Sequence, residues 1–87
     1  MSIMINVING YSFKTIFSYT SDIIPRENEV IHRDIENTAT NHITGTSESF
    51  VAYSENYKVR NVVHKLVKDN YTSSYSLAYI DVFVESV

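Results

Sequence analysis

The sequence predicts one α+β domain over residues 1–87: a mainly antiparallel sheet of about five strands with one amphipathic helix packed on one face. Three observations predict this fold class. Two alternating apolar segments flank an Asn-Gly pair near the N-terminus, an apolar stripe of helical spacing runs through residues 54–70, and alternation returns in residues 75–85. The expected element order is three or four strands, then the helix, then a last strand.

A hairpin is predicted from residues 3–8 and 11–19, which are rich in β-branched and aromatic side chains. The pair Asn9-Gly10 between them is a strong turn signal. A two-residue turn would mix apolar and polar residues on each face, whereas a three-residue loop ending at Gly10 keeps the faces separate and gives Gly10 the left-handed position of a bulge. The bulged hairpin pairs Val7 with Tyr11 and Ile5 with Phe13.

The middle of the chain is more polar. Residues 20–29 contain the single proline and read as a connection, and residues 29–35 alternate as a short strand does. Residues 37–49 include a predicted turn at Thr44-Gly45-Thr46. Residues 50–53 favour a fourth strand, because helical spacing begins only after them.

The helix is predicted over residues 54–70, with Ser54 as its N-cap. Its apolar stripe has the spacing i, i+3, i+4, i+7, i+8 and consists of Val59, Val62, Val63, Leu66 and Val67. The opposite side is polar and carries Lys58, Arg60, His64, Lys65 and Lys68. The many β-branched residues lower helix propensity, so packing against the sheet must hold the helix.

The last strand, residues 75–85, has an aliphatic face and an aromatic one. The aliphatic face suits the helix and carries Ala78, Ile80, Val82 and Val84. The other face carries Tyr75, Leu77, Tyr79, Asp81, Phe83 and Glu85. Because one helix covers only one face of a sheet, we expect the aromatic face to bind a partner, with Tyr75, Tyr79 and Phe83 as anchors.

The composition excludes several classes of protein. The formal net charge of -3 argues against a strongly basic nucleic-acid-binding protein and a polybasic membrane anchor. Without cysteine, neither a disulfide scaffold nor a thiolate zinc site can form. No apolar run suits a transmembrane helix or a signal peptide, so we expect a cytoplasmic protein that does not bind membranes and needs no cofactor.

The candidate catalytic motifs are incomplete. The His-Arg-Asp tripeptide at residues 32–34 occurs in kinase catalytic loops, but Ala39 stands where such a loop needs Asn. No nucleophile elbow occurs, and two glycines cannot build a phosphate-binding loop. Three histidines lack the spacing of metal ligands, namely His32, His42 and His64. We therefore expect neither an enzyme nor a metal site.

The charges divide along the chain. Residues 1–55 contain three basic and seven acidic residues, and residues 56–87 contain four and three. The acids between positions 22 and 36 are Asp22, Glu27, Glu29, Asp34 and Glu36. An acidic surface of this kind can occupy the basic cleft of a nucleic-acid-binding enzyme, so we expect these residues to steer association with the partner.

The leading hypothesis is a small non-enzymatic inhibitor that binds a protein and covers its surface. Residue types with AT-rich codons far outnumber those with GC-rich codons, which indicates a low-GC genome. Small proteins of this profile are common in Gram-positive bacteria and in their phages and plasmids. The specific hypothesis is therefore a phage- or mobile-element-encoded inhibitor of a host defence or nucleic-acid enzyme. In size and charge alone the chain resembles the anti-CRISPR class, and the resemblance assigns no residue.

Two alternatives from other classes remain open. The basic face of the predicted helix would contact phosphates in a small RNA- or DNA-binding regulator, through Lys58, Arg60, Lys65 and Lys68. The uncovered sheet face would instead pair with itself in a homodimeric immunity or structural protein.

Overall fold

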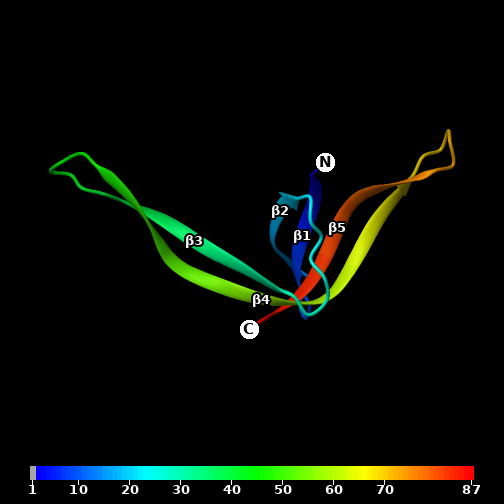
Figure 1. The fold of residues 1–87 in the computed structure, drawn as a ribbon, viewed down its shortest axis with the longest axis horizontal. Helices are drawn as coiled ribbons and strands as arrows, with labels where there is room; N and C mark the ends of the chain where they lie inside the picture. The colour runs from blue at the N-terminus through cyan, green and yellow to red at the C-terminus, as the bar shows by residue number, and fades with distance from the viewer. Residues whose placement is uncertain (1) are drawn as a thin grey trace.

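The computed structural model describes residues 2–87, which form one five-stranded sheet and no helix (Figure 1). The strands are β1 (Ile3–Asn9), β2 (Thr15–Ser21), β3 (Val30–Thr40), β4 (Ser47–Lys68) and β5 (Tyr75–Ser86). Their order is β2-β1-β5-β4-β3, with β1 and β5 parallel and the other neighbours antiparallel. The predicted α+β class is therefore wrong: the described chain is a curled mixed sheet without a packed helix.

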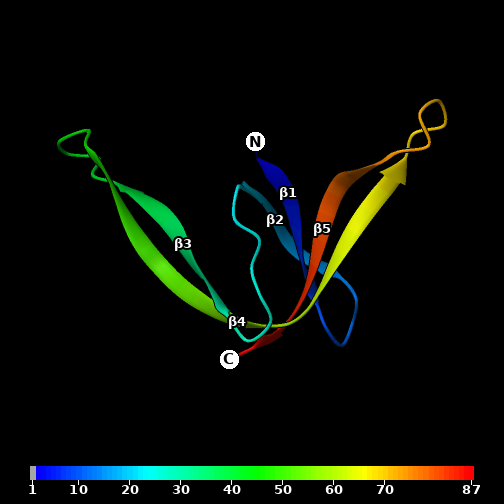
Figure 2. The same cartoon turned by 45° about the vertical axis from the view of Figure 1, so that its right-hand side comes forward.

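Strand β4 organises the fold. It has 22 residues, whereas the mean strand has about 5–6. Its first half pairs with β3 and its second half with β5, so two long hairpins share one strand and diverge like the arms of a V (Figures 1 and 2). We call residues 36–54 arm A and residues 64–79 arm B, and every residue in both arms is exposed. The rest of the described chain is the base.

Residues 54–70, predicted as a helix, lie mostly in β4. Val59 and Asn61 face consecutive residues of β5, so Arg60 is an extra residue and forms a β-bulge. The bulge widens the spacing between the inward-facing Val59 and Val62 from two residues to three. Apolar residues on both faces follow, and the combined pattern imitates the stripe of an amphipathic helix. The valines of this segment are β-branched and favour the strand that forms.

The core lies on the concave face of the base, which we call the inner face. It consists of Ile5, Val7, Tyr57, Val59, Ile80, Val82 and Val84. Arg33 of β3 places its guanidinium carbon 4.4 Å from the ring centroid of Phe17 of β2. Because β2 and β3 are the two edges of the sheet, the sheet curls until its edges touch. Residues 22–29 form the connector between β2 and β3, and Ile24 of this connector packs on the core as well.

The N-terminal hairpin has a longer loop than predicted. Phe17 and Tyr19 pair with the core residues of β1, in the places expected for Tyr11 and Phe13. The left-handed residue of the loop is Phe13, with φ of 59°, instead of Gly10. The predicted loop is therefore wrong, although the apolar face of β1 does meet an aromatic face of β2.

Three hairpin loops, residues 9–14, 41–46 and 69–74, share one construction. The side-chain oxygen of the first residue accepts hydrogen bonds from the N–H groups of the third and fourth; these first residues are Asn9, Asn41 and Asp69. The fifth residue is left-handed, and it is Phe13, Gly45 or Ser73. The third residue is large and projects into solvent: Tyr11, Ile43 and Tyr71 are 82%, 96% and 99% exposed.

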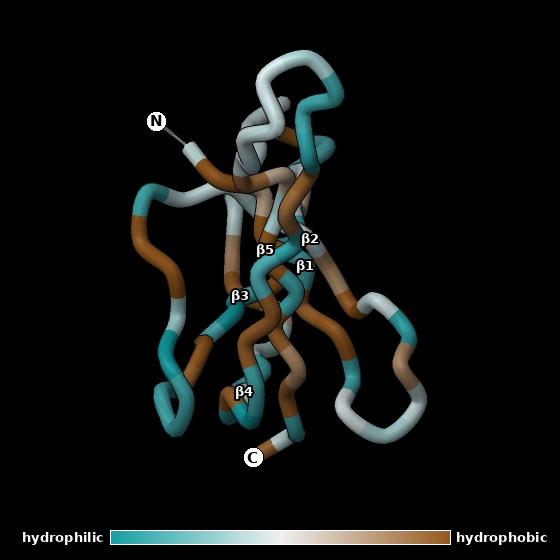
Figure 3. Tube along the Cα trace, turned by 90° about the vertical axis from the view of Figure 1, so that its right-hand side faces the viewer, coloured by the Kyte–Doolittle hydropathy of each residue, from teal (hydrophilic) through white to brown (hydrophobic). Residues whose placement is uncertain are grey.

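The molecule is elongated. Its principal extents are 63 × 31 × 21 Å, and its radius of gyration is 17.8 Å, against about 12 Å for a compact domain of this length. Hydrophobic and hydrophilic residues alternate along the strands near the base (Figure 3). Within residues 2–87 no second layer covers the arms. Two-stranded ribbons of this kind are marginally stable in water unless something packs on them.

Candidate binding surfaces

Arm B carries apolar side chains on both faces. Lys65 lies opposite Tyr79 and Leu66 lies opposite Leu77, so Ala78 is an extra residue and forms another β-bulge. Cross-strand partners share a face, and successive pairs alternate between faces. The inner face of arm B therefore carries Leu66, Leu77 and Tyr75, and the outer face carries Val67 and Tyr79. All five side chains are exposed.

The predicted aromatic anchors do not form one surface. Because of the bulge at Ala78, Tyr75 lies on the inner face of arm B and Tyr79 on the outer face. Phe83 lies on the outer face of the base, where its ring makes an edge contact with that of Phe13 at a centroid distance of 6.1 Å. Both phenylalanines border an open hollow of about 520 Å³. The structure thus distributes the anchors over three places.

Arm A is apolar mainly on one face. The register of β3 with β4 places Phe50 and Tyr53 on its inner face. Hydroxyl side chains dominate the outer face, including Thr38, Thr40, Ser47 and Ser49. Among Lys, Arg, Asp and Glu, arm A contains only Glu36 and Glu48. Arm B contains Lys65, Lys68 and Asp69, so the two arms have opposite net charge.

The predicted acidic stretch is divided between the connector and β3. The connector, residues 22–29, borders an open groove of about 990 Å³ beside the inner end of arm B. The groove is lined by charged and apolar residues of the connector and by three residues of β4. The charged ones are Asp22, Arg26, Glu27 and Glu29, the apolar ones are Ile23, Ile24 and Pro25, and those of β4 are Asn61, Val62 and His64. The carboxylate of Glu29 also accepts a hydrogen bond from the backbone N–H of Arg26 at 2.7 Å. Asp34 and Glu36 lie apart from the groove, in β3.

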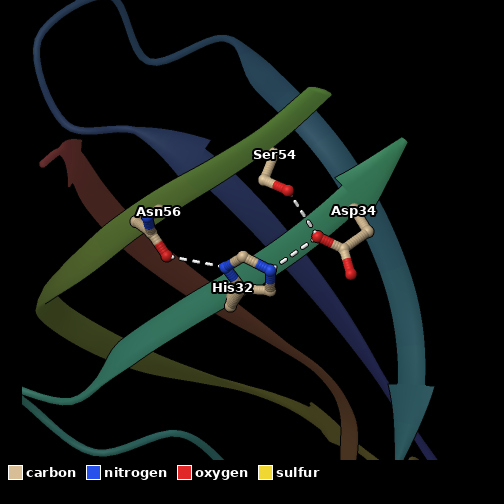
Figure 4. Close-up of polar contacts among 4 residues, drawn as sticks. All are labelled: His32, Asp34, Ser54 and Asn56. Carbon is tan, nitrogen blue, oxygen red and sulfur yellow. Dashed lines mark hydrogen bonds and ion pairs between the residues drawn. The ribbon is translucent and has the colours of Figure 1, made fainter. Parts of the chain in front are cut away.

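Asp34 belongs to a polar network on the outer face of β3 and β4 (Figure 4). Its Oδ1 accepts a hydrogen bond from the Ser54 hydroxyl at 2.6 Å and lies 2.6 Å from His32 Nε2. His32 Nδ1 lies 2.8 Å from Asn56 Oδ1. Hydrogen bonds with Asn56 and then with Asp34 raise the pKa of His32. Those with Ser54 and then with His32 lower the pKa of Asp34.

The network does not activate a nucleophile. In a Ser-His-Asp site the histidine takes the hydroxyl proton and the carboxylate holds the histidine. Here the Ser54 hydroxyl donates to Asp34, and both ring nitrogens of His32 already face the oxygens of Asp34 and Asn56. The four side chains instead fasten β3 to β4 at the root of arm A.

The predicted basic residues do not form a continuous patch. The register places Lys58, Arg60 and Lys65 on the outer face of β4 and Lys68 on the inner face. Arg60 forms an ion pair with Glu85 and donates a hydrogen bond to its carboxylate, and this hydrogen bond raises the pKa of Arg60. The Glu85 carboxylate offsets the positive charge of Arg60, which lies between Lys58 and Lys65 on the outer face of β4. This weakens the attraction of the three basic residues for phosphate.

An inner cluster was missed by the sequence reasoning. Arg33 forms an ion pair with Glu55 at 2.5 Å, and the Tyr57 hydroxyl donates to the same carboxylate. Hydrogen bonds from Tyr57 and then from Arg33 lower the pKa of Glu55. Alternation along β3 sends Arg33 inward and its two neighbours outward, which splits the His-Arg-Asp tripeptide between the faces. The alternation of side chains along this predicted strand was the signal in the sequence that could have placed Arg33 on the inner face.

Within residues 2–87, no group of three or more His, Cys, Asp or Glu side chains is arranged to hold a metal ion. The same part of the chain contains no helix long and apolar enough to cross a membrane. Comparison with known proteins gives no match: no family model fits the chain, no curated protein is similar to it, and no solved structure resembles it. Its function is therefore inferred from the arms and the connector.

Proposed function

We propose that this chain is a small non-enzymatic protein that binds another protein chain and acts by covering a surface. The observation that carries this proposal is arm B, a ribbon with exposed apolar side chains on both faces. Removal of such side chains from water is favourable by about 25 cal/mol per Å² of apolar surface, and this gain offsets the entropic cost of association. Tyrosines such as Tyr75 and Tyr79 add contact area at a low cost in conformational entropy.

The connector supplies the second part of the proposal. Glu27 and Glu29 are exposed beside the groove, and acidic side chains of this kind accelerate association with a basic target. Enzymes that act on nucleic acids present basic clefts. The specific form we propose is therefore an inhibitor of a host defence or nucleic-acid enzyme, encoded by a phage or mobile element and acting by occlusion.

Affinity capture tests this proposal. The immobilised chain is incubated with lysate from a low-GC bacterium, with and without nuclease. We expect the wild type to retain a protein and the variant L66D/L77D to lose it, because two buried carboxylates oppose the contact. The matched variant T38D/T40D adds the same charges to the polar face of arm A and should retain that protein.

The opposite result would favour the nucleic-acid alternative. Recovery of nucleic acid alone, lost after nuclease treatment, would contradict the proposal. Replacement of the four basic residues with alanine should then weaken binding and reduce its salt dependence; these residues are Lys58, Arg60, Lys65 and Lys68.

A further inference from the structure

We propose that the chain bound by arm B is a second copy of this protein. In a two-fold dimer, arm B of each copy lies against the inner face of arm A of the other copy. This inference rests on the proposed function, which assigns protein binding to arm B. It names a second copy as the chain that arm B contacts and leaves the acidic connector of each copy to the inhibited target.

The apolar faces of the two arms suit this contact. A strand pair that is apolar on both faces is normally buried between layers. Arm B has this character, with Leu66 and Leu77 on one face and Val67 on the other. Arm A offers one apolar face, with Phe50 and Tyr53, and its hydroxyl-rich face would remain in water. Arm A of a second copy therefore covers one of the two apolar faces of arm B, and no layer covers either face in the single chain.

The charges of the arms are complementary. Arm A carries Glu36 and Glu48 without a Lys or Arg, and arm B carries Lys65, Lys68 and Asp69. Glu48 lies on the inner face of arm A and Glu36 on the outer face, whereas Lys65 and Lys68 lie on opposite faces of arm B. Each contact between the inner face of arm A and one face of arm B therefore brings Glu48 toward one lysine. A two-fold axis creates the contact between arm A and arm B twice, so the attraction acts at both places. Contacts of arm A with arm A would instead place like charges together. The charge pattern thus favours the crossed arrangement over contacts between like arms.

The lengths of the arms also match. The paired part of arm A runs from Glu36 opposite Val51 to Thr40 opposite Ser47. That of arm B runs from Lys65 opposite Tyr79 to Lys68 opposite Tyr75. Both arms end in the same loop construction, and the two ribbons can lie alongside each other over most of their length.

The exposed area fits an obligate dimer. The described chain exposes 6548 Å², whereas a compact monomer of this mass exposes about 5,200 Å². The excess is about 1,300 Å² per chain and about 2,600 Å² for two chains, within the range of about 2,000–5,000 Å² that obligate homodimers bury. The connector acids lie outside both arms and remain available to a basic target.

Charge reversal tests this arrangement. The variant K65E/K68E makes both arms acidic, and the variant E36K/E48K makes both arms basic. We expect light scattering to give twice the 10.0 kDa of one chain for the wild type and a single-chain mass for each variant alone. An equimolar mixture should restore the double mass, because each acidic arm then meets a basic arm. The variant K14E/K58E changes two lysines outside the arms and should remain dimeric.

A wild-type mass of one chain throughout a dilution series would overturn the dimer. If that monomer still captured a protein through arm B, the proposed function would stand with another protein as partner. If the monomer captured no protein, both the dimer and the proposed function would be overturned. Dimers of unchanged stability in both charge variants would also overturn the crossed arrangement. Restoration of the dimer on mixing would show that the variants can fold.

Discussion

Arg33 on β3 lies over the ring of Phe17 on β2, with 4.4 Å between the guanidinium carbon and the ring centroid. Since these strands form opposite edges of the sheet, the contact closes the base. We expect the substitution R33M to lower the free energy of unfolding by at least about 1 kcal/mol, because it removes both this cation–π contact and the ion pair of Arg33 with Glu55. Urea denaturation measures the change. The control R26M, in the exposed connector, should change it by less than about 0.5 kcal/mol, and equal losses would contradict the account.

Gly45 and Ser73 hold the same left-handed position in two loops, with φ of 72° and 59°. A side chain in this conformation costs roughly 1–2 kcal/mol, and a Cβ added at Gly45 would meet nothing within 4 Å. We expect S73G to stabilise the protein by up to about 1 kcal/mol and G45A to destabilise it by a similar amount. Chemical denaturation reports both changes. Shifts of the same sign would refute the shared loop construction.

A substitution of Val63 tests whether residues 54–70 form a strand, as in the structure, or the helix that the spacing of their apolar residues suggests. Val63 pairs with Asp81 of β5 and is half-buried. Alanine is the best helix former but is depleted in strands, so V63A should lower stability by up to about 1 kcal/mol. Thermal denaturation followed by circular dichroism gives the sign. Increased stability together with a helical spectrum would contradict the strand.

The network of His32 and Asp34 predicts a pH dependence. The pKa of His32 is raised above its ordinary 6.5, so its contribution is fully present below pH 6.5 and is lost as the pH rises through the raised value. The pKa of Asp34 is lowered from 3.8, so its contribution is present above pH 3.8 and is lost in stronger acid. The melting temperature of the wild type should therefore exceed that of H32N most clearly between pH 3.8 and 6.5.

The matched variant for this prediction is H42N, which changes an exposed histidine in the loop of arm A. Its melting temperature should follow that of the wild type at every pH. A constant difference between the wild type and H32N from acid to alkaline pH would show that protonation of His32 contributes nothing.

Alternation in the sequence predicts much of the sheet. The strand predicted over residues 75–85 is confirmed as β5, and the apolar face of β1 is confirmed by the burial of Ile5 and Val7. The turn predicted at residues 44–46 lies in the loop that ends β3. In these segments local spacing and tertiary contacts agree, so the sequence pattern is sufficient.

The rest of the fold could not be obtained from periodicity, because β-bulges change it. The extra residue Arg60 converts a spacing of two into a spacing of three, and the extra residue Ala78 moves Tyr75 and Tyr79 to different faces. Which residue a strand leaves unpaired depends on its neighbour in the sheet. The repeated loop was visible as an Asn or Asp three positions before Ser or Thr at residues 9, 41 and 69.

The contact between the arms of two copies is tested most directly by nuclear Overhauser effects in a mixed dimer. One copy carries labelled Leu and Val methyl groups, and the other is unlabelled. We predict intermolecular effects from the methyl groups of arm B, at Leu66, Val67 or Leu77, to the ring protons of Phe50 and Tyr53 in the other copy. A sample that shows these methyl groups without intermolecular effects, and scatters as a single 10.0 kDa chain, would contradict the account.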